Sequence, residues 1–233
     1  MMDHKVRGPD GVALSKAKPD STRTIRALDG AFFARDPRKV SRELLGKVLV
    51  REAGTKGTSR RTGRIVEVEA YLGENDPAAH SFTGRTLRNE VLFGPPGHAY
   101  VYFIYGNHYC LNVSCQPEGQ AGGVLFRALE PLTGMEEMAR ARGIVVRTAR
   151  DLRLLTSGPG RLAEAFGITR ARDNNCDLTS AESGLWIGED GYRPKHVLRS
   201  PRVGITKAAD RKLRYTIAEN PFVSGPKLLM NQT

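Results

Sequence analysis

The stretch Gly63-Arg-Ile-Val-Glu-Val-Glu-Ala-Tyr-Leu-Gly73 predicts the strand around which the fold is built. From Ile65 to Leu72, β-branched and apolar residues alternate with polar ones, which is the pattern of a β-strand. A period of two places Ile65, Glu67, Glu69 and Tyr71 on one face of this strand. The opposite face is wholly apolar and is predicted core. The face with two carboxylates suits a solvated surface or the wall of a cleft.

A β-hairpin is predicted next, with strands over 100–105 and 109–114. The residues between them, Gly106-Asn107-His108, have turn chemistry because Gly and Asn adopt positive φ angles. Tyr105 is therefore placed at or beside an exposed tip. The hairpin carries four tyrosines in ten residues, more than a small core needs, since each buried hydroxyl requires a partner. They are Tyr100, Tyr102, Tyr105 and Tyr109.

Helices and strands alternate irregularly along the rest of the chain. A helix is predicted after Pro37, with Val40, Leu44 and Leu45 facing inward and Gly46 as its end. Strands are predicted over 47–51, 122–129, 185–188 and 213–218, and Pro131 is predicted to stop the second of these. A capping box from Thr133 to Glu136 predicts a helix that ends at Gly143, and a further helix is predicted over 148–155.

The segment Ser157-Gly-Pro159-Gly-Arg161 predicts another helix start, and that helix ends at Gly167. Backbone N–H groups at such a start can hold a phosphate, so Ser157 and Arg161 are candidate phosphate-binding residues. No βαβ unit repeats, and no linker divides the chain. We therefore expect one α+β domain over 26–233, with a mixed, largely antiparallel sheet and flanking helices, after a disordered basic tail over 1–25.

The charge of the chain favours a polyanionic partner. The formal net charge is +11 and the isoelectric point is near 9.9. Residues 1–62 hold 15 Lys and Arg against 7 Asp and Glu, and residues 193–214 hold 8 against 1. The basic segments thus flank a centre that is not basic, which fits nucleic acid or an acidic membrane surface.

The three cysteines, Cys110, Cys115 and Cys176, lack the spacing of a metal site, so free thiols in a reducing compartment are expected. No apolar run approaches the roughly 18 residues of a membrane span, and no signal-type apolar region begins the chain. These features predict a cytoplasmic protein, associated with the nucleoid if bacterial, that does not bind a membrane.

The motifs together resemble the alkyladenine (3-methyladenine, N-methylpurine) DNA glycosylase family, in the family's order from about Leu45 to Ser224. The matching stretches are Gly63-Arg-Ile-Val-Glu-Val-Glu-Ala-Tyr-Leu-Gly73, Ala78-Ala-His-Ser81, Tyr100-Val-Tyr-Phe-Ile-Tyr-Gly106, Leu111-Asn-Val-Ser114, Leu125-Phe-Arg-Ala-Leu-Glu-Pro131, Ser157-Gly-Pro159 and Arg202-Val-Gly204. The resemblance implies a fold like the C-terminal domain of methionyl-tRNA formyltransferase, with a hairpin that intercalates into DNA. It implies no cofactor and no metal, and damaged double-stranded DNA as partner.

The resemblance also implies roles for single residues. Glu69 would activate water, and Arg127 would help to hold that water. Tyr71 would stack on one face of a flipped purine, with His80 and Tyr102 on the other. Tyr105 would enter the minor groove, Asn112 would reject guanine's amino group, and Val203 would contact the base edge or the sugar.

The chemistry of base release needs residues of these types. Departure of the base leaves an oxocarbenium-like sugar, and a carboxylate both stabilises that charge and accepts a proton from water. Aromatic rings bind a cationic alkylated purine more strongly than a neutral one, by ~0.5–2 kcal/mol. No lysine occurs between Gly63 and Glu130, which argues against a Schiff-base nucleophile from this stretch. We therefore expect a monofunctional, monomeric glycosylase of base excision repair that acts on alkylated or deaminated purines.

Three alternatives stay open at this point. Glu67 lies two residues from Glu69 on the same face, and only the resemblance favours Glu69. A binding module without catalysis would use the aromatic hairpin as a stacking surface. A formyl-transfer or RNA-directed enzyme would want a separate catalytic domain, for which the chain has no room.

Overall fold

The long strand β3 (Arg61–Tyr71) lies at the centre of the sheet in this computed structural model, which describes residues 24–54, 58–104, 106 and 108–225. One edge of β3 pairs with β6 (Gly123–Thr133) along almost its whole length. The other edge pairs first with β2 (Val48–Arg51) and then with β9 (Arg214–Ile217). Most of β3 is therefore covered on both edges.

Within the described residues, nine strands form one sheet in the order β1-β7-β2-β3-β6-β5-β4, and β9 joins β8 to β3. All the pairings are antiparallel. The remaining strands are β1 (Arg26–Ala27), β4 (Ala99–Ile104), β5 (His108–Ser114), β7 (Leu185–Glu189) and β8 (Val197–Ser200). With the helices between them, they confirm the predicted single α+β domain with a largely antiparallel sheet.

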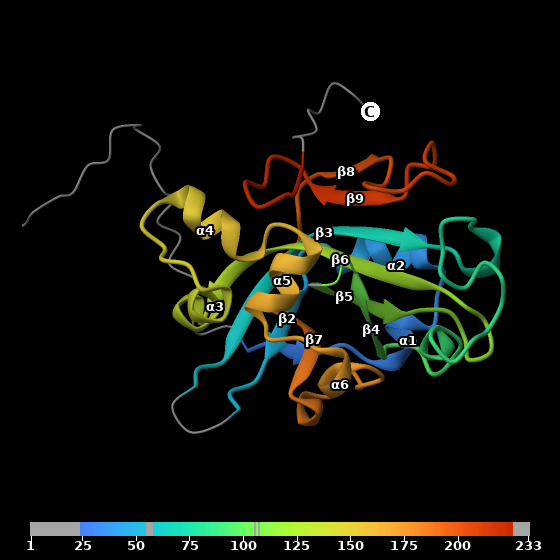
Figure 1. Ribbon diagram of the computed structural model, residues 1–233, viewed down its shortest axis with the longest axis horizontal. Helices are drawn as coiled ribbons and strands as arrows, with labels where there is room; N and C mark the ends of the chain where they lie inside the picture. The colour runs from blue at the N-terminus through green and yellow to red at the C-terminus, as the bar shows by residue number, and fades with distance from the viewer. Residues whose placement is uncertain (1–23, 55–57, 105, 107, 226–233) are drawn as a thin grey trace, which may run out of the picture.

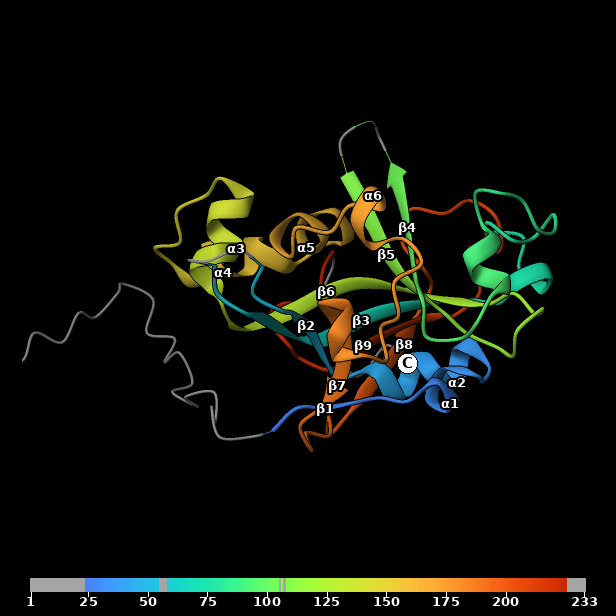
Figure 2. The same cartoon turned by 90° about the horizontal axis from the view of Figure 1, so that it is seen from below.

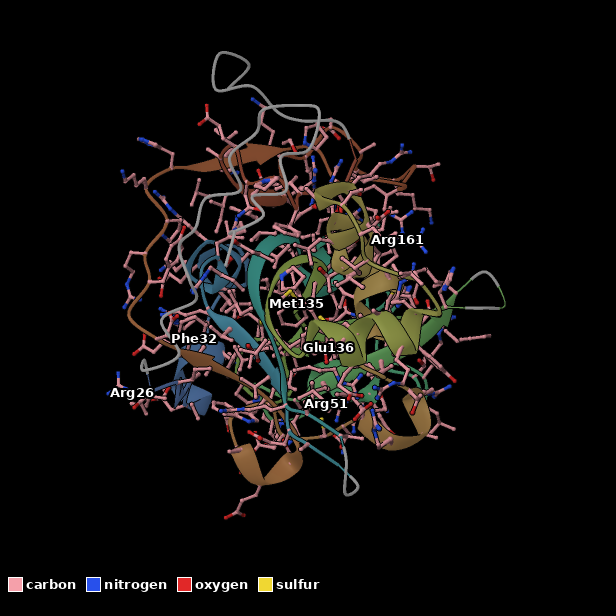
Figure 3. All side chains as sticks on the ribbon, turned by 90° about the vertical axis from the view of Figure 1, so that its left-hand side faces the viewer. Arg26, Phe32, Arg51, Met135, Glu136 and Arg161 are labelled. Atoms are coloured by element: carbon pink, nitrogen blue, oxygen red, sulfur yellow. The ribbon has the colours of Figure 1, made fainter. Side chains whose placement is uncertain are left out.

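The longer helices lie on opposite sides of this sheet, with α5 above it and α2 below it in Figure 2. Figure 3 looks from the side of α3, where Met135 and Glu136 mark its start and Arg161 marks α5. The α-helices are α1 (Gly30–Phe33), α2 (Pro37–Leu44), α3 (Met135–Arg142), α4 (Ala149–Thr156), α5 (Pro159–Ala165) and α6 (Arg170–Asp173); short 3₁₀ turns span Gly73–Asn75, Glu90–Phe93 and Ala181–Ser183.

The core between these layers is apolar and fully buried, with Leu44 of α2 on one side and Phe166, just after α5, on the other. Asp36 caps the start of α2, since its side chain accepts from the Arg38 N–H at 2.8 Å, and Pro37 is the first residue of the helix. Val40 and Leu44 are buried as predicted, and the helix ends before Gly46.

The alternation predicted along β3 is wrong at Ile65. Ile65 pairs with Leu129 and Glu67 with Ala128, so Val66 is an extra residue on β3. Ile65 consequently packs in the core with Val66 instead of sharing the face of Glu67. A β-bulge of this kind bends the strand and re-aims the side chains that follow.

Two predictions at the C-terminal end of β6 are also wrong: that Pro131 stops the strand, and that Thr133 caps the next helix. The strand continues through Pro131, which pairs with Gly63 beside a second irregularity. Proline is tolerated here because β5 pairs with β6 only from Gly123 to Leu125, so one edge is free of a strand at Pro131. Thr133 makes no capping box. Its hydroxyl pairs with that of Thr62 at 2.8 Å, and Gly134, with φ of 73°, begins α3 instead.

The consecutive strands β4 and β5 pair antiparallel, with Ile104 opposite His108, and both extend past α5 and α6 in Figure 2. Tyr105 and Asn107 lie outside the described residues, as does the predicted tail except for Thr24 and Ile25. The helix predicted over 148–155 is α4, whose cap is a capping box between Thr148 and Asp151. In the part of the chain that the structure describes, no helix is long and apolar enough to cross a bilayer.

Candidate active site

A single row of side chains crosses four strands of the sheet. Glu69 on β3 pairs with Leu125 on β6, Leu125 with Asn112 on β5, and Asn112 with Tyr100 on β4. Residues directly opposite each other on antiparallel strands project from the same face. The register therefore gathers residues from four strands, between Glu69 and Leu125 of the chain, along one face of the sheet.

This face forms the floor of a cavity of about 400 Å³, within the roughly 300–1,000 Å³ usual for small-molecule sites. The loops at 78–81 and 203–205 and the first residue of α5, Pro159, complete the walls. The lining residues are Tyr71, Ala78, Ala79, His80, Ser81, Leu92, Tyr100, Tyr102, Ile104, Cys110, Asn112, Gly123, Leu125, Arg127, Pro159, Val203, Gly204 and Ile205. The structure thus brings Tyr71, His80, Tyr102, Asn112, Arg127 and Val203 together in the lining of one cavity.

Glu69 lies directly behind this lining, fully buried. The Val203 backbone N–H donates to Oε1 at 2.7 Å, and the Tyr71 hydroxyl donates to Oε2 at 3.1 Å. The Arg127 guanidinium forms an ion pair with Oε1 at 3.3 Å. All three partners line the cavity, so the carboxylate is held at its edge from three directions.

Burial raises the pKa of Glu69 above its ordinary value, and the neighbouring Glu67 charge adds to the rise. Arg127, the Val203 N–H and the Tyr71 hydroxyl oppose it. The pKa of Arg127 is raised too: burial alone would lower it, but the charges of Glu69 and Glu67 outweigh that effect. A buried carboxylate with a raised pKa is a stronger base than an exposed one.

Arg127 reaches the cavity because it is the extra residue of a bulge on β6. Glu67 pairs with Ala128 and Val68 with Phe126, which leaves Arg127 without a partner in the register. Bulges re-aim side chains and are common beside active sites. The Arg127 side chain is only 9% exposed, and its Nε donates to Glu67 Oε1 at 2.9 Å.

The structure distinguishes Glu67 from Glu69, the two carboxylates between which the sequence alone could not decide. Glu67 is fully buried and accepts from Arg127, from Arg214 Nε at 2.7 Å and from the Ser224 N–H at 2.6 Å. Of these partners only Arg127 lines the cavity, whereas all three partners of Glu69 do. This geometry favours Glu69 over Glu67 as the carboxylate that acts in the cavity.

Three rings cluster on one wall. The His80 and Tyr102 rings meet edge to face with centroids 4.6 Å apart, and the Tyr100 hydroxyl lies 3.0 Å from His80 Nδ1. Burial and the nearby Arg88 guanidinium lower the pKa of His80, so the imidazole is neutral at neutral pH. Asn112 is buried, and its amide donates to the Tyr100 carbonyl at 3.1 Å.

Arg202 is a site residue that reasoning from the sequence missed. Its guanidinium makes a fully buried, bidentate pair with Asp76, at 2.8 Å for one bond, and lies 4.6 Å from the centre of the Tyr71 ring. It also donates to the Ala70 carbonyl at 3.0 Å. Arg202 thereby ties the loops before His80 and around Val203 to β3. Its place beside Val203 in a matched motif was the available signal, whereas nothing in the sequence pointed to Asp76.

The candidate phosphate-binding pair lies at the edge of the site. Ser157 is buried and forms a bridge with Ala128, and the Gly158 N–H donates to the Arg127 carbonyl at 2.9 Å. Arg161 is exposed, and its guanidinium donates to the Ser157 carbonyl at 3.3 Å. The Ser157 segment therefore supports the backbone of Arg127. Tyr105, the predicted intercalating residue, lies outside the described residues.

Comparison with known proteins shows the family of the chain. A family model described as methylpurine-DNA glycosylase matches residues 31–221. A protein of Koribacter versatilis, provisionally named a 3-methyladenine DNA glycosylase, is 60% identical over 205 residues, which are 88% of this chain and 96% of the relative. Proteins of Burkholderia lata and Rhodopseudomonas palustris with the same provisional name are 48% and 46% identical, over 85% and 90% of this chain and 91% and 95% of their own. The chain belongs to the methylpurine-DNA glycosylase family.

Proposed function

We propose that this glycosylase is monofunctional: it binds a damaged purine rotated out of duplex DNA and hydrolyses its glycosidic bond without cutting the strand. The observation that carries the proposal is Glu69, a buried carboxylate with a raised pKa held at the edge of an aromatic cavity. A flipped nucleotide needs such a pocket, because chemistry at the glycosidic bond is inaccessible inside the base stack.

In the proposed reaction Glu69 acts as general base. A water oxygen attacks C1′ of the deoxyribose while the carboxylate takes a proton from that water. The C1′–N bond breaks, and its electron pair leaves with the purine. The products are an abasic sugar, the base and protonated Glu69, which returns its proton to solvent. A cationic purine leaves as the neutral base, whereas a neutral purine such as hypoxanthine leaves as an anion that takes up a proton from solvent. The charge of ionised Glu69 also stabilises the oxocarbenium-like transition state.

The cavity wall supplies the binding contacts. Tyr71 stacks on one face of the purine, and His80 with Tyr102 stacks on the other. Neutral His80 and the uncharged tyrosines place no positive charge against a cationic base such as 3-methyladenine or 7-methylguanine. Asn112, buried on the floor, disfavours the amino group of guanine, so that among guanines only a cationic one such as 7-methylguanine is bound well enough to react. The Val203 side chain is 38% exposed and lies at the rim, where it contacts the base edge or the sugar.

Contacts to the DNA backbone complete the proposal. The basic segments of the chain attract the phosphates, and Arg161 with the Ser157 segment contacts a phosphate beside the lesion. Tyr105 fills the space left by the flipped nucleotide. The enzyme acts as a monomer in the cytoplasm on alkylated and deaminated purines.

The proposal is tested by single-turnover base release from duplex oligonucleotides that carry 3-methyladenine, 7-methylguanine, hypoxanthine or ethenoadenine. Wild type is compared with Glu69→Gln. We expect release by wild type alone, with strands that stay intact until alkali is added, and lesion binding by both proteins. Strand cleavage without alkali contradicts the monofunctional assignment. Binding by both proteins without release by either supports a binding module instead.

A further inference from the structure

The cluster of charges behind the cavity contains a carboxylate and an arginine that the proposed reaction does not use. Glu67 and Arg214 are both buried, and the Glu67 oxygens accept from three donors at 2.6–2.9 Å. Taking two charges of each sign out of water costs several kcal/mol per ion, and that cost is offset only when the geometry is very good. An arrangement of this kind therefore calls for a reason beyond stability.

The arrangement assigns every nitrogen of Arg127 to a partner. Its Nε donates to Glu67, one terminal nitrogen pairs with Glu69 at 3.3 Å, and the other lies 3.4 Å from the Ser224 hydroxyl. A guanidinium is planar, so a bond at Nε fixes the plane in which the terminal nitrogens lie. Glu67 thus determines how Arg127 presents itself to Glu69 and to the cavity.

Arg214 supplies the second positive charge that balances the charges of the two carboxylates. It donates from Nε to Glu67 and from a terminal nitrogen to the Ser224 carbonyl at 2.7 Å. Two carboxylates and two guanidiniums carry no net charge. Without Arg214, Glu67 would compete with Glu69 for the one guanidinium of Arg127. The Ser224 N–H completes the cluster from the C-terminal segment.

From these contacts we propose that Glu67 is a positioning residue, which with Arg214 and Ser224 fixes the Arg127 guanidinium against Glu69. The segment around Ser224 is thereby part of the active-site framework, although it does not line the cavity. This inference rests on the proposed role of Glu69. It assigns Glu67 no contact with substrate.

The inference predicts opposite pH effects for two variants. The groups that face Glu69 are Glu67 and Tyr71 on β3, Cys110 on β5, Arg127 on β6 and Arg202 on the loop before β9. Glu67→Gln removes a like charge and frees Arg127 for Glu69, so the acidic limb of the rate profile moves to lower pH. Arg214→Gln lets Glu67 draw Arg127 away, so the limb moves to higher pH.

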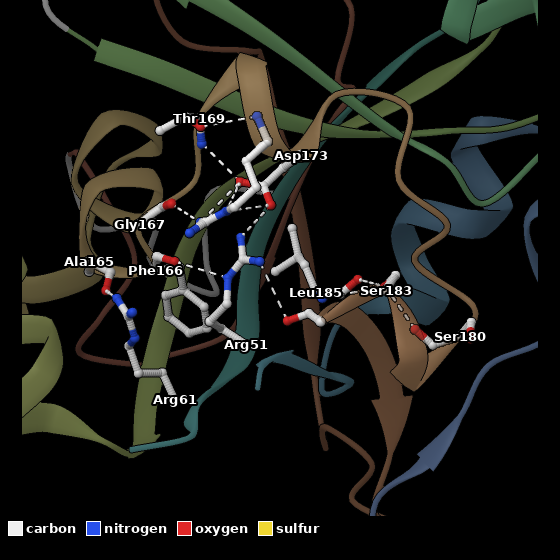
Figure 4. A network of polar contacts seen from close by, with 12 residues as sticks. Arg51, Arg61, Ala165, Phe166, Gly167, Thr169, Asp173, Ser180, Ser183 and Leu185 are labelled. Atoms are coloured by element: carbon white, nitrogen blue, oxygen red, sulfur yellow. Dashed lines mark hydrogen bonds and ion pairs between the residues drawn. The ribbon is translucent and has the colours of Figure 1, made fainter. Parts of the chain in front are cut away.

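The size of the rate effect follows from positioning. A misplacement of about 1 Å in an active site costs about 100-fold in rate. We therefore expect Glu67→Gln to slow single-turnover base release by about 100-fold, while its affinity for an abasic duplex stays within about twofold. A matched control is Asp173→Asn, which neutralises another buried carboxylate paired with arginine (Figure 4); Asp173 does not line the cavity. It should leave the rate unchanged.

A second readout does not depend on base release. In wild type the Arg127 Nε–H, bonded to Glu67, should give a resolved nitrogen-15 NMR signal that exchanges slowly with water. The signal should be lost in Glu67→Met, which leaves the Arg127 Nε–H without its acceptor, and kept in Asp173→Asn. If the signal persists in Glu67→Met, or if the pH limbs of Glu67→Gln and Arg214→Gln move the same way, the positioning role of Glu67 is overturned. Failure of wild type to release any base, with the NMR signals as expected, would count against the proposed function alone.

Discussion

Two of the buried arginine–carboxylate clusters among the described residues differ in what surrounds them. Arg51 on β2 pairs with Asp173 on α6 at 2.8 Å, and its other nitrogens donate to the carbonyls of Phe166 and Gly184 (Figure 4). Arg127 on β6 pairs with Glu69 and Glu67. Both clusters join distant segments, but only the second has partners that line a cavity.

The difference concerns how completely each carboxylate is enclosed. Asp173 also accepts from the Thr169 N–H and from Arg172, so its oxygens are occupied by residues of its own helix and by Arg51. Glu69 instead has its three partners on the wall of a 400 Å³ space. The same pair of residue types therefore holds the fold together in one place and faces a potential ligand in the other.

The largest expected effect is on catalysis by Glu69. Glu69→Gln keeps the size of the side chain but removes the proton acceptor, so base release should fall by about 10²–10⁴-fold, the usual contribution of a general base. Binding to a lesion duplex should be retained. Single-turnover rates and a binding titration check both statements, and a variant that released base within about threefold of wild type would contradict the role of Glu69.

The same substitution should not destabilise the fold. Because burial raises the pKa of Glu69 in the folded state, its ionised form lowers stability as the pH rises through that pKa. At pH 7 the neutral Gln avoids this penalty. The melting temperature of Glu69→Gln should therefore equal or exceed that of wild type, and a clear decrease would show that the ionised carboxylate stabilises the fold.

The rate of base release should fall about tenfold when the contact that supports the cavity wall is weakened by Arg202→Lys. Arg202→Lys keeps the charge beside Asp76 but loses the planar fork that binds both carboxylate oxygens. The loops of His80 and Val203 should then be held less well, and base release should slow about tenfold, which corresponds to about 1.4 kcal/mol. Arg172→Lys, at a half-exposed partner of Asp173, is the matched control and should leave the rate unchanged.

A smaller effect is expected when the hydrogen bond from Tyr71 to Glu69 is removed. Tyr71→Phe keeps the ring but removes a donor that opposes the rise in the pKa of Glu69. The acidic limb of the rate profile should move to higher pH, and the rate at neutral pH should change by no more than about threefold. A shift to lower pH would contradict the assigned direction of this hydrogen bond.

The smallest expected change in rate comes from the other cluster. Asp173→Asn leaves Arg51 without its buried counter-charge, which typically costs about 3–5 kcal/mol of stability. Thermal unfolding should therefore occur at a clearly lower temperature, while base release from an alkylated duplex below that temperature stays within about twofold of wild type. A large loss of rate would mean that the two clusters are coupled.

Much of the fold and of the cavity could be predicted because the relevant signals are local. Two strand-like runs and the turn residues between them predicted the hairpin of β4 and β5, and Pro37 and Gly46 delimited α2 correctly. The six residues that line one cavity, Arg127 among them, were expected there only from the family resemblance.

The features that local sequence patterns missed depend on how strands pair in the sheet and on bonds between residues far apart in the chain. The bulges at Val66 and Arg127 exist only because β3 and β6 pair in a particular register, so strict alternation placed Ile65 on the wrong face. The long-range bonds of Arg202 to Asp76 and of Arg214 to Glu67 span 126 and 147 positions, which no periodicity reveals. The strand β8, with only four residues, lacks a clear pattern.

The most direct test of the central claim is the pH dependence of single-turnover release of 7-methylguanine from a duplex, with spontaneous release subtracted. This base leaves as a neutral molecule, so the enzyme needs to supply no proton to it. If ionised Glu69 acts as the base, the wild-type rate falls at low pH with an apparent pKa above about 4.3, the ordinary value for glutamate, and this limb is absent from the residual rate of Glu69→Gln. A limb that persists unchanged in Glu69→Gln would contradict the assignment of Glu69 as the base.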